Sequence, residues 1–120
     1  KEARLNPEEL ARYIVDVVED KKAQDIVLLD LRPDVVIADF FIICNGTGDR
    51  QLKALTDHVR EKVKEKYGLL PFSTEGTPES GWMLMDYGHV VLHIFVEERR
   101  TYYNLEGLWR ADGKVVLTIQ

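Results

Sequence analysis

Residues 81–109 restrict the fold of this chain more than any other stretch, because they combine two strand patterns, a tight turn and an aromatic-rich helix. Apolar side chains recur at every second position of residues 90–96, which predicts a strand with one apolar face and one mixed face. Gly88 can adopt a positive φ in the turn just before this strand. We therefore predict a hairpin formed by Trp82–Asp86 and Val90–Val96.

Two amphipathic helices are predicted upstream of the hairpin. Asn6 can cap the first helix, Pro7 suits its first position, and apolar residues recur at helical spacing to about Asp20. A glycine-containing turn at residues 46–48 precedes the second helix, whose apolar stripe ends near Gly68. Each helix is expected to pack against a sheet by one face.

Three further strands are predicted at residues 25–31, 39–45 and 69–74. The first two are apolar on both faces, which is typical of interior strands. The second and third, joined by a helix, should form a right-handed crossover between parallel strands. With the hairpin, this predicts a mixed α/β sheet of about five strands flanked by helices, similar in layout to the nucleotidyltransferase fold. We expect one domain over residues 1–120, in which residues 110–120 form a tail of unassigned structure.

Composition favours a cytoplasmic protein with protein partners. A chain of 120 residues with 45% hydrophobic content is large enough for a single core. Cys44 is the one cysteine and lies in an apolar run, which indicates a buried thiol in a reducing compartment. No apolar run is long enough to span a bilayer, so we expect no membrane contact. The net charge of −5 disfavours binding to a phosphate backbone, so we expect little direct nucleic-acid binding and a basic protein surface as partner.

A nucleotide-handling enzyme of nucleotidyltransferase-like fold is the alternative interpretation. Such enzymes hold metal ions with carboxylates two positions apart on a strand, and the predicted strands carry no such pair. His89 and His93 would lie about 13 Å apart on a strand, too far for one ion. The turn at residues 46–48 lacks the lysine of a Walker loop. We therefore expect no catalytic residues, no metal site and no cofactor. The acidic residues that stand alone at strand ends or turns are Asp25, Asp30, Asp39 and Asp86.

Short motifs spread over residues 22–109 carry a family resemblance. They include Trp82-x-x-x-Asp86-x-Gly88, Val90-Val91-x-His93 and Glu98-Arg99-x-x-Tyr102-Tyr103-x-Leu105-Glu106-x-Leu108-Trp109. Further motifs upstream are Gln24-Asp25-Ile26, residues 47–51, Asp57-His58-Val59 and Glu75-Gly76. In this order they resemble the ribosomal silencing factor family, also called Iojap-related. The chain departs from the family at His89, where an acidic residue is frequent.

The resemblance implies a translation repressor without enzymatic activity. It implies binding to the large ribosomal subunit through the universal large-subunit ribosomal protein fourteen, and a steric block of small-subunit joining. It leaves open whether the free protein forms a homodimer.

The resemblance also maps a docking surface onto the hairpin. Its residues are Trp82, Leu84, Asp86, Tyr87 and Gly88, with Glu75 and Glu98 near the rim. Trp82 and Tyr87 are expected at or near a sheet edge, with Tyr87 exposed in the turn. Trp109, with Leu105 and Tyr102, is expected instead to pack the last helix onto the sheet.

Overall fold

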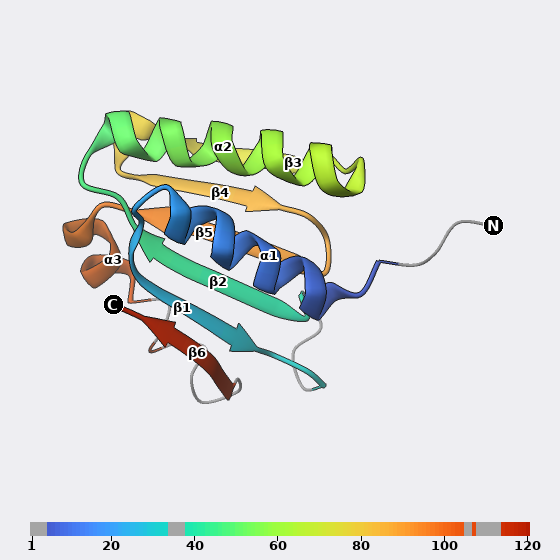
Figure 1. The fold of residues 1–120 in the computed structure, drawn as a ribbon. Coiled ribbons are helices and arrows are strands. Elements are labelled where there is room, and N and C mark those ends of the chain that lie inside the picture. Colours follow the sequence, from blue (N-terminus) through green and yellow to red (C-terminus); the bar gives the residue numbers. More distant parts are fainter. Residues whose placement is uncertain (1–4, 34–37, 105–106, 108–113) are drawn as a thin grey trace.

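The computed structural model describes residues 5–33, 38–104, 107 and 114–120. Within them, six strands form one mixed sheet in the order β3-β4-β5-β2-β1-β6. The helices α1 and α2 lie side by side on one face of this sheet, and α3 lies at one end of it (Figure 1). The elements are α1 (Pro7–Asp20), β1 (Gln24–Asp30), β2 (Phe40–Asn45), α2 (Asp49–Tyr67), β3 (Ser73–Thr77), the 3-10 turn η1 (Pro78–Ser80), β4 (Trp82–Asp86), β5 (Val90–Phe95), α3 (Glu97–Tyr103) and β6 (Lys114–Ile119).

The two long helices begin and end where their capping residues predict. The side-chain oxygen of Asn6 accepts hydrogen bonds from the backbone N–H groups of Glu8 and Glu9, at 2.8 and 3.4 Å, and so caps α1. The helix α2 ends at Gly68, whose φ of 70° is the left-handed conformation that glycine adopts without strain. Both predicted helices are therefore confirmed.

The strands β4, β5, β2 and β1 form the interior of the sheet. The residues of β2 and β5 are buried on both faces, because each strand has neighbours on both sides and side chains packed above and below. The predicted hairpin is confirmed, since β4 and β5 pair in antiparallel register with Trp82 opposite Phe95 and Asp86 opposite Val91. Cys44 is fully buried in β2, and this burial raises the pKa of its thiol to about 12.

The predicted crossover between residues 39–45 and 69–74 is wrong. The third strand is Ser73–Thr77, and it pairs with β4 in antiparallel register at the sheet edge. The parallel neighbour of β2 is β5. The physical reason lies in the side chains: β3 is polar and mostly exposed, which suits an edge, whereas β5 is apolar on both faces and suits the sheet interior.

The predicted strand number is low by one, because the tail contributes a strand. Residues 114–119 form β6, which pairs with β1 in antiparallel register and closes the opposite edge of the sheet. Three of its side chains, Val116, Leu117 and Ile119, pack on the helix-side core. The packing role predicted for Trp109 falls outside the described residues. Tyr102, which was expected to pack with it, is 76% exposed.

The apolar core is divided by the sheet into two clusters. The larger cluster lies between the sheet and α1 and α2, and includes Met83 and Met85 of β4. The smaller cluster lies on the opposite face, which we call the open face because neither α1 nor α2 contributes to it; it contains residues of β1, β2 and β5. Trp82 and Leu84 pack against the smaller cluster and remain partly exposed.

Candidate functional site

The residues predicted for docking divide between the two faces of the sheet. Side chains alternate along a strand, so Trp82, Leu84 and Asp86 point to the open face while the methionines between them point to the helices. All three are partly exposed. The alternation of side chains along β4 therefore places these three residues together.

The neighbouring strands extend this set into a short strip. Directly opposed residues of paired strands share a face, and Leu84 lies between Glu75 on β3 and His93 on β5. Glu75 is exposed at the sheet edge, Leu84 is half-buried, and His93 is buried. We call Trp82, Leu84, Asp86 and Glu75 the open-face strip. It combines an apolar centre with carboxylates at its rim.

Tyr87 does not belong to this strip, and its predicted exposure is wrong. Its side chain is only 7% exposed and packs in the helix-side core. Burial raises the pKa of its hydroxyl to about 12, against a smaller opposing effect of the positive charge of Arg60. Tyr87 was expected to project into solvent because it lies in a turn. Its ring instead packs in the core between the sheet and the helices α1 and α2.

Gly88 and Asp86 give this turn its shape. Gly88 has a φ of 90°, and a Cβ atom at this position would lie 2.8 Å from the ring of Phe72. The carboxylate of Asp86 accepts a hydrogen bond of 2.7 Å from the backbone N–H of Gly88. The positive φ favours glycine here, so Gly88 contributes to the shape of the hairpin turn.

Glu98 lies in the first turn of α3 and is exposed. It lines a hollow at the end of the sheet together with Glu79, Gly81 and Arg99. Gly81 directly precedes β4, so Glu98 lies beyond the Trp82 end of the open-face strip. Its place at the rim of the docking surface stays a prediction.

The structure also shows aromatic residues that the sequence reasoning missed. His93, Phe95 and Tyr103 surround the indole of Trp82 on the open face, with Tyr103 and Trp82 ring centres 6.5 Å apart. Burial lowers the pKa of His93 to about 4, so this imidazole is neutral at pH 7. The hairpin register could have placed His93 and Phe95 here, but Tyr103 reaches the site only through the tertiary position of α3.

Arg100 is a second missed residue, and its role is structural. It is 9% exposed, and its guanidinium donates hydrogen bonds to the carbonyl oxygen of Asp25 at 2.6 Å and to Oδ1 of Asn45 at 2.9 Å. A polar hollow of about 610 Å³ lies beside these groups. Arg100 therefore joins α3 to the ends of β1 and β2.

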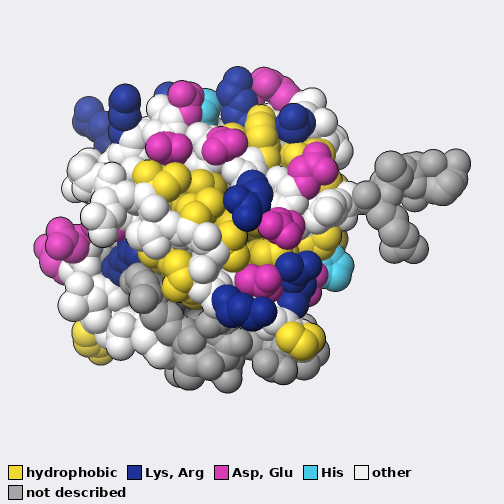
Figure 2. Space-filling view, turned by 60° about the horizontal axis from the view of Figure 1, so that its bottom comes forward, with side chains coloured by type: hydrophobic (Ala, Val, Ile, Leu, Met, Phe, Trp, Pro, Cys, Tyr) yellow, Lys and Arg dark blue, Asp and Glu magenta, His cyan; other side chains and the backbone are white. Residues whose placement is uncertain are grey.

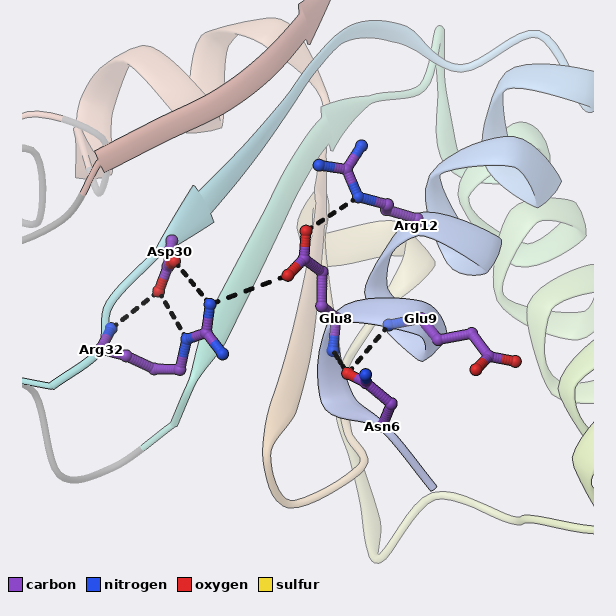
Figure 3. Close-up of polar contacts among 6 residues, drawn as sticks. All are labelled: Asn6, Glu8, Glu9, Arg12, Asp30 and Arg32. Atoms are coloured by element: carbon purple, nitrogen blue, oxygen red, sulfur yellow. Dashed lines mark hydrogen bonds and ion pairs between the residues drawn. The ribbon is translucent and has the colours of Figure 1, made fainter. Parts of the chain in front are cut away.

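The carboxylates considered for metal binding have other partners. Asp30 accepts two hydrogen bonds from the guanidinium of Arg32, at 3.0 and 2.9 Å, and Arg32 also approaches Glu8 at 3.8 Å (Figure 3). The hydrogen bond from Arg32 holds the pKa of Asp30 below its ordinary value. Asp39 lies 3.2 Å from the imidazole of His89. Within the described parts of the chain, no group of three or more metal-binding side chains comes together.

The charged side chains do not form a one-signed field on the face shown in Figure 2. There, Lys and Arg side chains are interspersed with Asp and Glu around a centre of apolar side chains. The whole chain carries 16 basic and 21 acidic residues. Strong binding to a phosphate backbone needs clustered cations, which this face lacks.

Across the ranges that the structure describes, no helix has the length and apolar character to cross a membrane.

Comparison with known proteins gives one consistent family. The sequence model of the family described as "Ribosomal silencing factor during starvation" matches residues 4–120. A ribosomal silencing factor of Halalkalibacterium halodurans is 40% identical over 88% of this chain and 89% of its own length. A crystal structure of a protein from Chromobacterium violaceum has a TM-score of 0.81 and 35% sequence identity, covering 88% of this chain and 87% of that chain. A mouse protein named "Mitochondrial assembly of ribosomal large subunit protein 1" is 31% identical over 80% of this chain and 43% of its own length.

Proposed function

Because the chain belongs to the ribosomal silencing factor family, we propose that it binds the large ribosomal subunit and prevents the small subunit from joining. The open-face strip is the observation that carries this proposal. Trp82 and Leu84 offer partly exposed apolar area, and Glu75 and Asp86 place acidic groups beside it. Protein interfaces commonly combine a small apolar centre with a polar rim.

The partner in this proposal is the universal large-subunit ribosomal protein fourteen, as the family resemblance implies. The name of the mouse relative also refers to the ribosomal large subunit. A ribosomal protein that contacts RNA carries basic residues, and the net charge of −5 on this chain favours approach to such a surface. Repression then requires no chemical reaction, because a folded domain on the joining surface excludes the other subunit by its volume.

The contact residues of this surface are the open-face strip, with Glu98 at the rim. We assign Tyr87 and Gly88 to the shape of the hairpin, because the first is buried and the second has a φ of 90° in the turn. The alternative of a nucleotide-handling enzyme has no support from the described carboxylates, since Asp30, Asp39 and Asp86 each contact a neighbouring group. We expect the protein to act in the cytoplasm, where ribosomes and a reduced thiol such as Cys44 coexist.

Co-sedimentation with separated ribosomal subunits tests the proposal. Leu84→Ala should weaken binding to the large subunit by about 1–2 kcal/mol, because it removes apolar contact at the centre of the strip. Leu70→Ala is the matched control, since Leu70 is 55% exposed and lies outside the strip. Both variants are first checked by thermal unfolding. Binding of the unchanged protein to small subunits alone, or to neither subunit, would contradict the proposal.

A charge reversal tests the acidic rim separately. Glu75→Lys should slow association with the large subunit, and the difference should shrink as salt increases because exposed charges are screened. Glu65→Lys makes the same change on the exposed surface of α2 and should have the smaller effect. Equal association rates for the two variants at low salt would exclude Glu75 from the docking surface.

A further inference from the structure

The helix α3 adds an exposed aromatic ring, Tyr103, to the open face next to Trp82. The two ring centres lie 6.5 Å apart, and the ring of Tyr103 also lies 6.0 Å from that of Phe95. Tyr103 nevertheless remains 51% exposed. Apolar side chains that are exposed singly are normal, but a contiguous exposed patch marks an interaction site. Tyr103 thus extends the apolar centre of the open-face strip from β4 onto α3.

A small hollow lies between Tyr103 and the strip. Among the described residues its walls are Trp82, His93, Phe95 and Tyr103, and its volume is about 180 Å³. His93 and Phe95 are 5% and 1% exposed, so they form the floor, and the partly exposed rings of Trp82 and Tyr103 form the rim. A cavity of about 150 Å³ holds a benzene molecule, so this hollow has room for one branched or cyclic group.

The walls of this hollow present almost entirely apolar surface. The ring atom Nδ1 of His93 lies 3.5 Å from the indole N–H of Trp82, which donates to it, and the ring atom Nε2 is buried. Burial lowers the pKa of His93, so none of the four described walls is charged at pH 7. An occupant with a hydrated charge would lose its water without gaining a partner, whereas an apolar occupant gains contact area.

We propose that the hollow receives one uncharged, apolar side chain of the protein that docks on the open-face strip, and that Tyr103 is a specificity residue for this side chain. The proposal rests on the proposed function, because the docked protein supplies the side chain. Continuity favours this source: Trp82 forms both a wall of the hollow and one end of the strip. Interface residues that fill such desolvated pockets commonly dominate the binding energy.

Alanine variants of the two neighbouring tyrosines of α3 test the inference through binding to purified large subunits. Tyr103→Ala removes one wall of the hollow and should weaken binding about five- to thirtyfold, as for other residues at the centre of an interface. Tyr102→Ala is the matched control, because Tyr102 is 76% exposed and does not line the hollow. It should bind within about twofold of the unchanged protein. Thermal unfolding first shows whether each variant is folded, and equal binding by two folded variants would overturn the inference.

A measurement on the unchanged protein decides the question even if Tyr103→Ala does not fold. Neohexanol and choline have nearly the same shape, but choline carries a positive charge where neohexanol has a carbon atom. Neohexanol should shift the indole N–H resonance of Trp82 in a saturable way in proton–nitrogen NMR, and choline should shift it much less. The absence of a shift with neohexanol would overturn the inference. So would an equal or larger shift with choline, because the rings would then hold a cation by their faces.

The two measurements also distinguish a failure of this inference from a failure of the proposed function. If neohexanol binds beside Trp82 but the protein binds no large subunit, the hollow is supported as an apolar site and the proposed function is wrong. If the protein binds large subunits and Tyr103→Ala binds them as tightly as Tyr102→Ala, the proposed function stands and the hollow has no part in docking.

Discussion

Replacing Tyr87 separates a residue that stabilises the fold from one that contacts a partner. The ring is 7% exposed in the helix-side core, so Tyr87→Ala should lower the free energy of unfolding by about 3–5 kcal/mol, as for other buried aromatic rings. The hydroxyl group is buried without a hydrogen-bond partner among the described residues. Tyr87→Phe should therefore leave the free energy of unfolding unchanged or raise it by up to about 1 kcal/mol.

Urea unfolding followed by tryptophan fluorescence measures both changes. The slope of free energy against urea should stay constant, and the midpoint should fall for the alanine variant and stay or rise for the phenylalanine variant. Tyr87→Phe should also bind large subunits like the unchanged protein, because the ring contributes to the core and not to the contact. The reasoning is refuted if Tyr87→Ala changes stability by less than about 0.5 kcal/mol and still abolishes binding.

The elements that the sequence predicts correctly are those fixed by local chemistry. Asn6 caps α1, Gly68 ends α2, and the alternation in residues 90–96 identifies β5. Each of these signals lies within the element that it specifies or next to it. The errors concern partner choice between distant segments: β6 pairs with β1, although more than 80 residues separate them along the chain. No local pattern encodes such a pairing, and its selection depends on which edges the rest of the sheet leaves open.

The candidate site follows the same division. The family resemblance names Trp82, Leu84 and Asp86, and the alternation of side chains along β4 places all three on one face. Alternation does not extend into a turn, so the direction of the Tyr87 side chain could not be predicted from it. The aromatic residues around Trp82 could be predicted only in part. The hairpin register places His93 beside Leu84, whereas Tyr103 reaches Trp82 through the packing of α3. The alternation of side chains thus explains why the residues of the open-face strip share a face, but it does not predict the contact between Trp82 and Tyr103.

Three further perturbations test the structural reasoning. Gly76→Ala should destabilise the protein by more than about 1 kcal/mol in urea unfolding, because the φ of Gly76 is +83° and a Cβ there would collide with the Trp82 carbonyl. Gly48→Ala is the control and should change the stability little, since a Cβ at Gly48 would have no atom within 4 Å. Arg100→Met should cost about 2–3 kcal/mol in the same assay, because it leaves a carbonyl oxygen of β1 and an amide oxygen of β2 without their donor. The third perturbation is acid. Burial lowers the pKa of His93 from 6.5 to about 4, so between these values the unfolded chain binds a proton that the folded protein excludes. The stability due to neutral His93 is therefore complete above pH 6.5 and is lost as the pH falls towards 4, with a loss of about 2 kcal/mol between pH 7 and pH 5. Urea unfolding at the two pH values should show this loss in the unchanged protein and most of it removed in His93→Phe. An equal loss in both proteins would mean that His93 titrates in the folded state much as it does in the unfolded chain, which would contradict the effect of its burial.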